Sequence, residues 1–166
     1  MEALLNIIDN INDWVGKLVS FLIFPIIGII IFEVIMRYFL HASQLWVPET
    51  SVFLFGCLFV LGGGYTFLHD GHVRLDVLYE RFPPRLKAAT DLITSLFFFI
   101  FCFVLIWKGW AMAWDSLITM EKSPSAFSPV LFPVKMLIPV GGLLLFLQGL
   151  AKFIRDLSFV LRGNKT

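Results

Sequence analysis

Histidine and carboxylate side chains gather at one point of this 166-residue chain, where a long apolar run ends. His69, Asp70, His72 and Asp76 lie close together there, and imidazole and carboxylate groups are the donors that bind transition metals. Arg74 stands between them, and such groups at a membrane edge satisfy one another more often than they bind a metal. We therefore expect a surface that contacts another protein, and we expect no metal site. Metal binding stays open as the lesser alternative.

A second pair of charges, Glu33 and Arg37, lies inside an apolar run. Residues four apart share one face of a helix, so these two can form an ion pair. Charges at membrane depth are costly and usually have a reason. A structural pair that anchors the helix to a neighbour is the simpler interpretation, and a transport role for Glu33 is the alternative. Lys108 and Lys135 also lie within or at the ends of apolar runs, and we expect their long side chains to reach the outer interface.

The rest of the sequence lacks the combinations that enzymes and electron carriers need. No nucleophile, base and orienting acid occur together, and no phosphate-binding glycine loop follows a strand. His41, like the other two histidines, lies at the edge of an apolar run, whereas haem ligands would face each other inside the spans. The chain shows no internal repeat and no polar midplane, unlike a self-sufficient secondary transporter. We predict a non-enzymatic protein with no catalytic residue, no cofactor and no nucleic-acid partner.

The composition is that of an integral membrane protein, because 58% of the residues are hydrophobic and only 15% are charged. Four apolar runs cover about residues 14–40, 50–68, 92–114 and 130–154. Each can cross the hydrocarbon slab of about 30 Å as a helix that rises about 1.5 Å per residue. The predicted fold is therefore all-α, a single four-helix membrane domain over residues 1–166. Pro25 and Gly28 are expected to bend the first span.

Lysine and arginine predict the orientation of the helices. They are concentrated in the amino terminus, in the loop after the second run and in the carboxyl tail. The positive-inside rule therefore places both termini, and the loop between the second and third helices, in the cytoplasm. That loop is predicted to form an amphipathic segment along the membrane. The residues before Asp13 form either a short amphipathic helix on the inner membrane face or an extension of the first helix.

The second helix carries small residues at a regular spacing. Glu49, Gly56, Gly63 and Asp70 recur every seven residues and share one stripe of the helix. Small residues let helix backbones approach closely. The two glycines pack either within this chain or against another subunit, and the sequence leaves both alternatives open.

Several short matches to one family occur in the same order along nearly the whole chain. They are Arg37-Tyr38-Phe39, Trp46 with Glu49, Gly62-Gly63-Gly64, His72-Val73-Arg74-Leu75-Asp76, and Ile138-Pro139-Val140-Gly141. In these segments the chain resembles the small, DctQ-like membrane subunit of tripartite ATP-independent periplasmic (TRAP) transporters. Within that family it is most similar to the group named for mannitol or chloroaromatic compounds, through Gly64-Tyr65, His69-Asp70-Gly71-His72-Val73-Arg74, Glu121 with Ser123-Pro124, and Leu147-Gln148-Gly149. Leu40 departs from the pattern, because many relatives carry asparagine there.

The resemblance implies one part of a three-part machine in the bacterial inner membrane. Its partners would be a soluble periplasmic binding protein, a large membrane subunit that holds the substrate and sodium sites, and membrane lipid. The small subunit would brace the large one and help to dock the binding protein, in a sodium-coupled system that takes up an organic acid, such as a carboxylate. The residues expected at structural contacts and interfaces are Glu33, Arg37, Trp46, Glu49, Gly56, Gly63, His72, Arg74 and Asp76.

Two other functions are alternatives to that of a small transporter subunit. The first is a four-helix proton-coupled exporter of small molecules that acts as a dimer through Glu33, although Arg37 lies one turn away. The second is a membrane anchor for a redox or signalling enzyme, which the missing haem ligands and the missing cytosolic domain disfavour.

Overall fold

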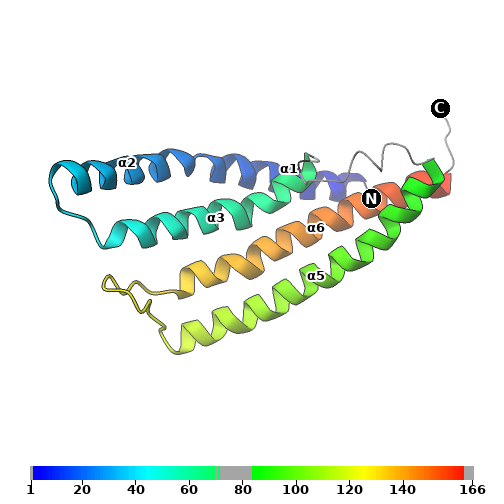
Figure 1. Ribbon diagram of the computed structural model, residues 1–166. Coiled ribbons are helices and arrows are strands. Elements are labelled where there is room, and N and C mark those ends of the chain that lie inside the picture. The colour runs from blue at the N-terminus through cyan, green and yellow to red at the C-terminus, as the bar shows by residue number, and fades with distance from the viewer. Residues whose placement is uncertain (1, 70, 72–83, 163–166) are drawn as a thin grey trace.

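The computed structural model describes residues 2–69, 71 and 84–162 (Figure 1). Its helices are α1 (Glu2–Ser20), α2 (Ile23–Phe39), α3 (Trp46–Leu68), α5 (Pro84–Ile118) and α6 (Phe132–Arg162). Four segments are long and apolar enough to cross a membrane: Glu2–Phe39, Trp46–Leu68, Thr94–Ile118 and Phe132–Arg155. The prediction of an all-α membrane protein with four spanning helices is therefore confirmed.

The first apolar run contains two helices, because it is interrupted ahead of Pro25. Proline has no backbone N–H, so it cannot donate to the carbonyl of Phe21 one turn earlier. That carbonyl accepts a bond from the N–H of Phe24 instead, with an N···O distance of 3.2 Å, and α1 ends at Ser20. The residues before Asp13 belong to the same helix as the residues after it. Of the two alternatives for the amino terminus, the structure therefore has the continuous helix.

The helices lie side by side with α6 at the centre of the arrangement. α5 packs along α6, α6 packs along α3, and α1 contacts both α3 and α6, while α2 packs mainly against α3. Both described ends of the chain lie at one end of the molecule, and the loops after α2 and α5 lie at the other (Figure 1). We call these the terminal end and the loop end. The assignment of the terminal end to the cytoplasm stays a prediction.

Glycines set the distance between the central helices. A Cβ atom added at Gly141 of α6 would lie 2.5 Å from the carbonyl oxygen of Val60 in α3. A Cβ atom at Gly109 of α5 would lie 2.8 Å from the Cγ2 atom of Ile138 and 3.2 Å from the backbone nitrogen of Pro139. Each glycine therefore leaves room for the neighbouring helix where any side chain of its own would clash, as small residues allow in membrane proteins.

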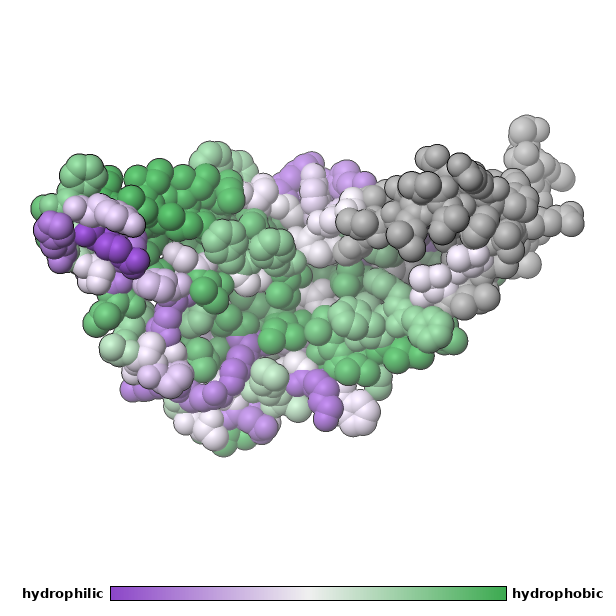
Figure 2. Space-filling model, viewed as in Figure 1, coloured by the Kyte–Doolittle hydropathy of each residue, from purple (hydrophilic) through white to green (hydrophobic). Residues whose placement is uncertain are grey.

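The outer surface of the helices is mostly apolar. Phe24 of α2, Phe59 of α3 and Phe97 of α5 are each about two-thirds exposed or more, at 67%, 73% and 66%. Green, hydrophobic atoms cover much of the molecule between its two ends in Figure 2. Contiguous apolar surface of this kind suits contact with lipid or with other membrane helices. The helices are therefore built to sit in a bilayer.

Candidate functional site: polar clusters at the two ends of the helices

A polar cluster joins α1 to α6 at the terminal end. The side-chain amide of Gln148 in α6 accepts a hydrogen bond from Asn12 Nδ2 at 2.9 Å and donates one to Asp9 Oδ1 at 2.8 Å. Arg155, two turns further along α6, forms an ion pair with Asp9 at 2.5 Å. Asn12 and Gln148 are each 1% exposed. We call Asp9, Asn12, Gln148 and Arg155 the inner cluster.

The same part of α1 is fitted closely to α3. The Oδ1 atom of Asn12 lies against Gly64, where an added Cβ would come within 2.0 Å of it. Gly16, one turn along α1, lies against the ring of Tyr65 in the same way, at 2.2 Å. His69 follows at the end of α3 and lies 3.8 Å from the carboxylate of Asp13. Three helices therefore meet at this end, and polar groups set their register.

Glu33 and Arg37 form the ion pair that their spacing predicts, and the carboxylate also binds the next loop. Arg37 Nη2 donates to Glu33 Oε1 at 2.7 Å, and the backbone N–H of Gln44 donates to Oε2 at 3.1 Å. Glu33 is 8% exposed. Both carboxylate oxygens therefore have partners within the chain. Glu33 connects the end of α2 to the loop that leads into α3.

The loop between α5 and α6, at the loop end, is tied to α3 through a second carboxylate. Ser123 Oγ donates a hydrogen bond to Glu49 Oε1 in the first turn of α3. The loop closes on itself through a bridge between Lys122 and Val130 and through a bond from the Leu131 N–H to the Glu121 carbonyl at 2.9 Å. Glu49 therefore fastens the loop after α5 to the first turn of α3.

Glu121 and Lys135 form an ion pair at the loop end, and we predict from it a pH dependence of this loop. The ammonium group of Lys135 donates to the Glu121 carboxylate, and this bond holds the pKa of Glu121 below its ordinary value of 4.5. A depressed carboxylate pKa means that the pair stabilises the folded loop above about pH 4.5 and stops doing so as the pH falls through the lowered value. We expect the Leu131 amide to lose protection against hydrogen exchange, after correction for the intrinsic rate, as the pH falls from about 6 to about 3.

The matched control for that measurement is Lys135→Gln. This variant lacks the ammonium group, so its Leu131 protection should show no step in the same pH range. A protection factor that stays constant in the unmodified chain down to pH 3 would contradict the assignment.

Other residues expected at interfaces have few partners of their own. The ring of Trp46 lies near that of Phe32, with centroids 6.1 Å apart, at the contact of α3 with α2. A Cβ atom added at Gly56 or at Gly63 would meet no atom within 4 Å. The described part of the chain therefore does not fill the space above these two glycines. His72, Arg74 and Asp76 lie outside the described residues, as does most of the predicted amphipathic segment. The last part of that segment, residues 84–91, belongs to α5.

The described residues hold no group of three histidine, cysteine, aspartate or glutamate side chains that could bind a metal ion. His69 is described, and its ring nitrogen Nδ1 lies 3.1 Å from the Tyr65 carbonyl. Three members of the candidate metal cluster, Asp70, His72 and Asp76, lie outside the described residues, so the structure does not bear on them.

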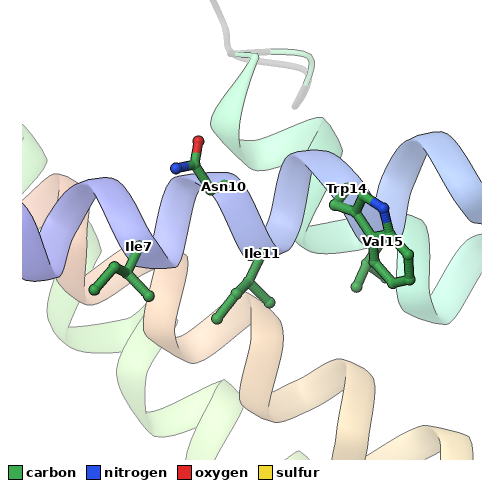
Figure 3. Close-up of a pocket in the computed structure, with 5 residues that line it drawn as sticks. All are labelled: Ile7, Asn10, Ile11, Trp14 and Val15. Carbon is green, nitrogen blue, oxygen red and sulfur yellow. The ribbon is translucent and has the colours of Figure 1, made fainter.

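A hollow on the surface of α1 is apolar and open (Figure 3). Ile7, Asn10, Ile11, Trp14 and Val15 line it, all from one helix. Among these side chains only the Asn10 amide and the Trp14 indole nitrogen carry polar atoms. Nothing here gathers the several polar groups that fix a small molecule in a binding site.

The inner cluster contains residues that the sequence analysis missed as a group. Asp9 and Asn12 are three apart and Gln148 and Arg155 are seven apart, so each pair lies on one face of its helix. Gln148 is also the one side-chain amide in an otherwise apolar run. Polar side chains in membrane helices usually bond across to a neighbour. That signal was present, but it does not tell which helix supplies the partner.

The described polar groups hold helices and loops of one multi-pass membrane protein together. A family model for the DctQ component of tripartite ATP-independent periplasmic transporters matches residues 26–159. The chain belongs to this family. It is a non-enzymatic permease component of the bacterial inner membrane, as the sequence analysis predicted.

Individual relatives agree with the family. A Haemophilus influenzae protein named as a TRAP transporter small permease protein is 25% identical over 147 residues, which cover 86% of this chain and 87% of that protein. The C4-dicarboxylate TRAP transporter small permease protein DctQ of Vibrio cholerae is 30% identical over 52% of this chain and 37% of its own length.

Other relatives are much longer than this chain. The sialic acid TRAP transporter permease protein SiaT of Haemophilus influenzae is 26% identical over 102 residues, which are 61% of this chain. The chain spans only 16% of SiaT and 22% of the isethionate TRAP transporter permease protein DctMQ of Oleidesulfovibrio alaskensis. In both relatives the matched region is therefore part of a longer polypeptide.

Proposed function

We propose that this chain braces the large transport subunit of a sodium-coupled, binding-protein-dependent uptake system for organic acids, and that it helps to dock the periplasmic binding protein. The observation that carries the proposal is that the buried and half-buried carboxylates of this chain bind other residues of the same chain. Glu33 is bound to Arg37 and to the loop before α3, and Asp9 is bound to Gln148 and Arg155. These carboxylates hold helices in place, and the substrate and sodium sites are left to the large subunit.

The proposed partner is supported by the long relatives. In SiaT and DctMQ the matched region is joined to several times its own length of further chain, within proteins named as permeases. Joining two parts that bind each other makes their contact intramolecular, so the fusion in these relatives agrees with a direct contact between the separate parts here. The open space above Gly56 and Gly63 suits such a membrane partner.

The proposed substrate class is supported by names alone. Relatives are named for sialic acid, isethionate and C4-dicarboxylates, all of which are organic acids. Within this class we propose a carboxylate, and 2-oxo acids and aromatic carboxylates are the compounds to test first.

Docking of the binding protein is proposed for the loop end. Met120 and Phe127 are 59% and 48% exposed there, on a loop that is bonded to Glu49.

Reconstitution into liposomes tests the proposal. The small chain, the large membrane subunit of the same transporter and the binding protein should together take up a radiolabelled organic acid when a sodium gradient is imposed. Leaving out any one of the three proteins, or the gradient, should reduce uptake to background. Tight co-purification of the two membrane subunits is expected in the same preparation.

Glu33→Gln separates this function from the exporter that the sequence left as an alternative. The amide can still accept a bond from Arg37 or from the Gln44 N–H, so we expect the variant to assemble and to keep most of its uptake. Transport by the small chain alone as a dimer, abolished by Glu33→Gln, would contradict the proposal.

At the predicted cytoplasmic side, Arg74→Ala or Asp76→Ala should reduce assembly with the large subunit more than it changes substrate preference. A shift in preference with assembly intact would contradict this expectation.

A further inference from the structure

Lys108 of α5 has an exposed side chain in the middle of an apolar spanning helix. Among the described residues no acidic side chain pairs with it, and it differs in this from Lys17, Lys135 and Arg37, which all have carboxylate partners. An ionisable side chain inside a membrane span usually faces protein or water and has a partner. The structure therefore leaves one intramembrane charge to be explained.

The helix contacts give the depth of Lys108. The uncharged part of α3 runs from Thr50 to Leu68, so its centre lies next to Val60. Val60 contacts Gly141 of α6, and α6 in turn places Ile138 and Pro139 against Gly109. Because a helix rises about 1.5 Å per residue, Lys108 lies within about 5 Å of the level of Val60.

This depth changes the expectation for Lys108. The hydrocarbon slab extends about 15 Å to each side of its midplane, so about 10 Å separates the Lys108 backbone from the outer boundary. A lysine stem of four carbons does not span that distance. Lys108 therefore does not reach the interface as the sequence analysis expected. Lys135 lies six residues before Gly141 in α6, closer to the loop end, and its ammonium group bonds to Glu121 of the loop after α5.

The neighbours of Lys108 form a continuous exposed face. Phe97, Phe101 and Val104 lie eleven, seven and four residues before it, the spacing of one helix face, and they are 66%, 57% and 49% exposed. α5 packs along α6 with a different face, which carries the buried Cys102 and Ala113. We call Phe97, Phe101, Val104 and Lys108 the Lys108 face.

We propose that the Lys108 face is a docking surface for a transmembrane segment of the large subunit, and that this segment presents a carboxylate to Lys108 Nζ. The inference rests on the proposed function. It is supported by charge complementarity, because an ammonium group near the midplane is costly and usually pairs with an opposite charge, and the described part of this chain supplies none to Lys108. Lipid tails supply none, and the longer relatives carry permease sequence next to this region.

The test is recovery of the large subunit with an affinity-tagged small chain after co-expression. We expect Lys108→Met to lower this recovery at least tenfold, and Lys108→Arg to keep at least half of it, because arginine keeps the charge. Trp107→Leu is the matched control, since Trp107 lies at the same depth, is 65% exposed and points about 100° away around the helix. Its recovery should equal that of the unmodified chain.

A photo-crosslinking benzoylphenylalanine residue keeps the proposal testable if a variant folds poorly. Placed at Val104, it should form an adduct with the large subunit, and placed at Trp107 it should react mainly with lipid. Normal recovery with Lys108→Met, or Val104 adducts only with lipid or with a second copy of the small chain, would overturn the inference. If the unmodified chain recovers no large subunit at all, the proposed function fails instead.

Discussion

The isolated chain carrying Gly141→Val is expected to unfold in detergent at about 10 °C below the unmodified protein. The cause is the contact of α6 with α3, where an added Cβ would lie 2.5 Å from the Val60 carbonyl oxygen and 2.9 Å from its carbon. These are backbone atoms, so no side-chain rotation relieves the clash and the helices must separate. Overpacking of this kind costs about 3 kcal/mol. Thermal unfolding followed by circular dichroism measures the change.

Gly28→Ala is the control for this experiment. Gly28 is also a helical glycine in a spanning segment, but a Cβ atom added there meets no atom within 4 Å. Alanine favours the helix more than glycine does, so the melting temperature should stay the same or rise slightly. A Gly141→Val chain as stable as the unmodified protein would show that α3 and α6 do not meet at Val60.

Gln148→Leu is expected to lower the free energy of unfolding by about 3 kcal/mol. The change removes two hydrogen bonds between α6 and α1, each worth about 1 kcal/mol in a membrane protein. It also leaves the amide of Asn12 without its bond across to α6 and Asp9 with Arg155 alone. Asn12 is 1% exposed, so water cannot replace the hydrogen bond that its amide loses.

A double-mutant cycle tests whether this loss of stability comes from the interaction between Asn12 and Gln148. Asn12→Leu should also destabilise the chain, but the double variant should lose clearly less than the sum of the two single changes, because the two amides share one bond. Strict additivity would mean that the two side chains do not interact. Asp13→Asn, in an exposed pair with Lys17, serves as a control and should have little effect.

Much of the fold could be predicted from local sequence. Apolar runs gave four spanning helices, and Pro25 marked the point where the first run is interrupted. The Glu33–Arg37 pair was predictable because its geometry depends only on a spacing within one helix.

The contacts between helices were not predictable in the same way. Gln148 bonds to Asn12 across 136 residues, and no local pattern specifies which helices become neighbours. The glycines show the same limit. Gly63 and Gly64 are adjacent in the sequence, yet only Gly64 is filled within the described chain, by Asn12. Sequence spacing identifies small residues, but the pairing of helices decides which of them meet their own chain.

The inner cluster also has a consequence for how this protein is made. Asn12 precedes Gln148 by 136 residues, so the polar groups of α1 leave the ribosome long before their partners in α6. The cluster therefore closes only after α6 has been synthesised. A product truncated before α6 would leave Asp9 and Asn12 without these partners.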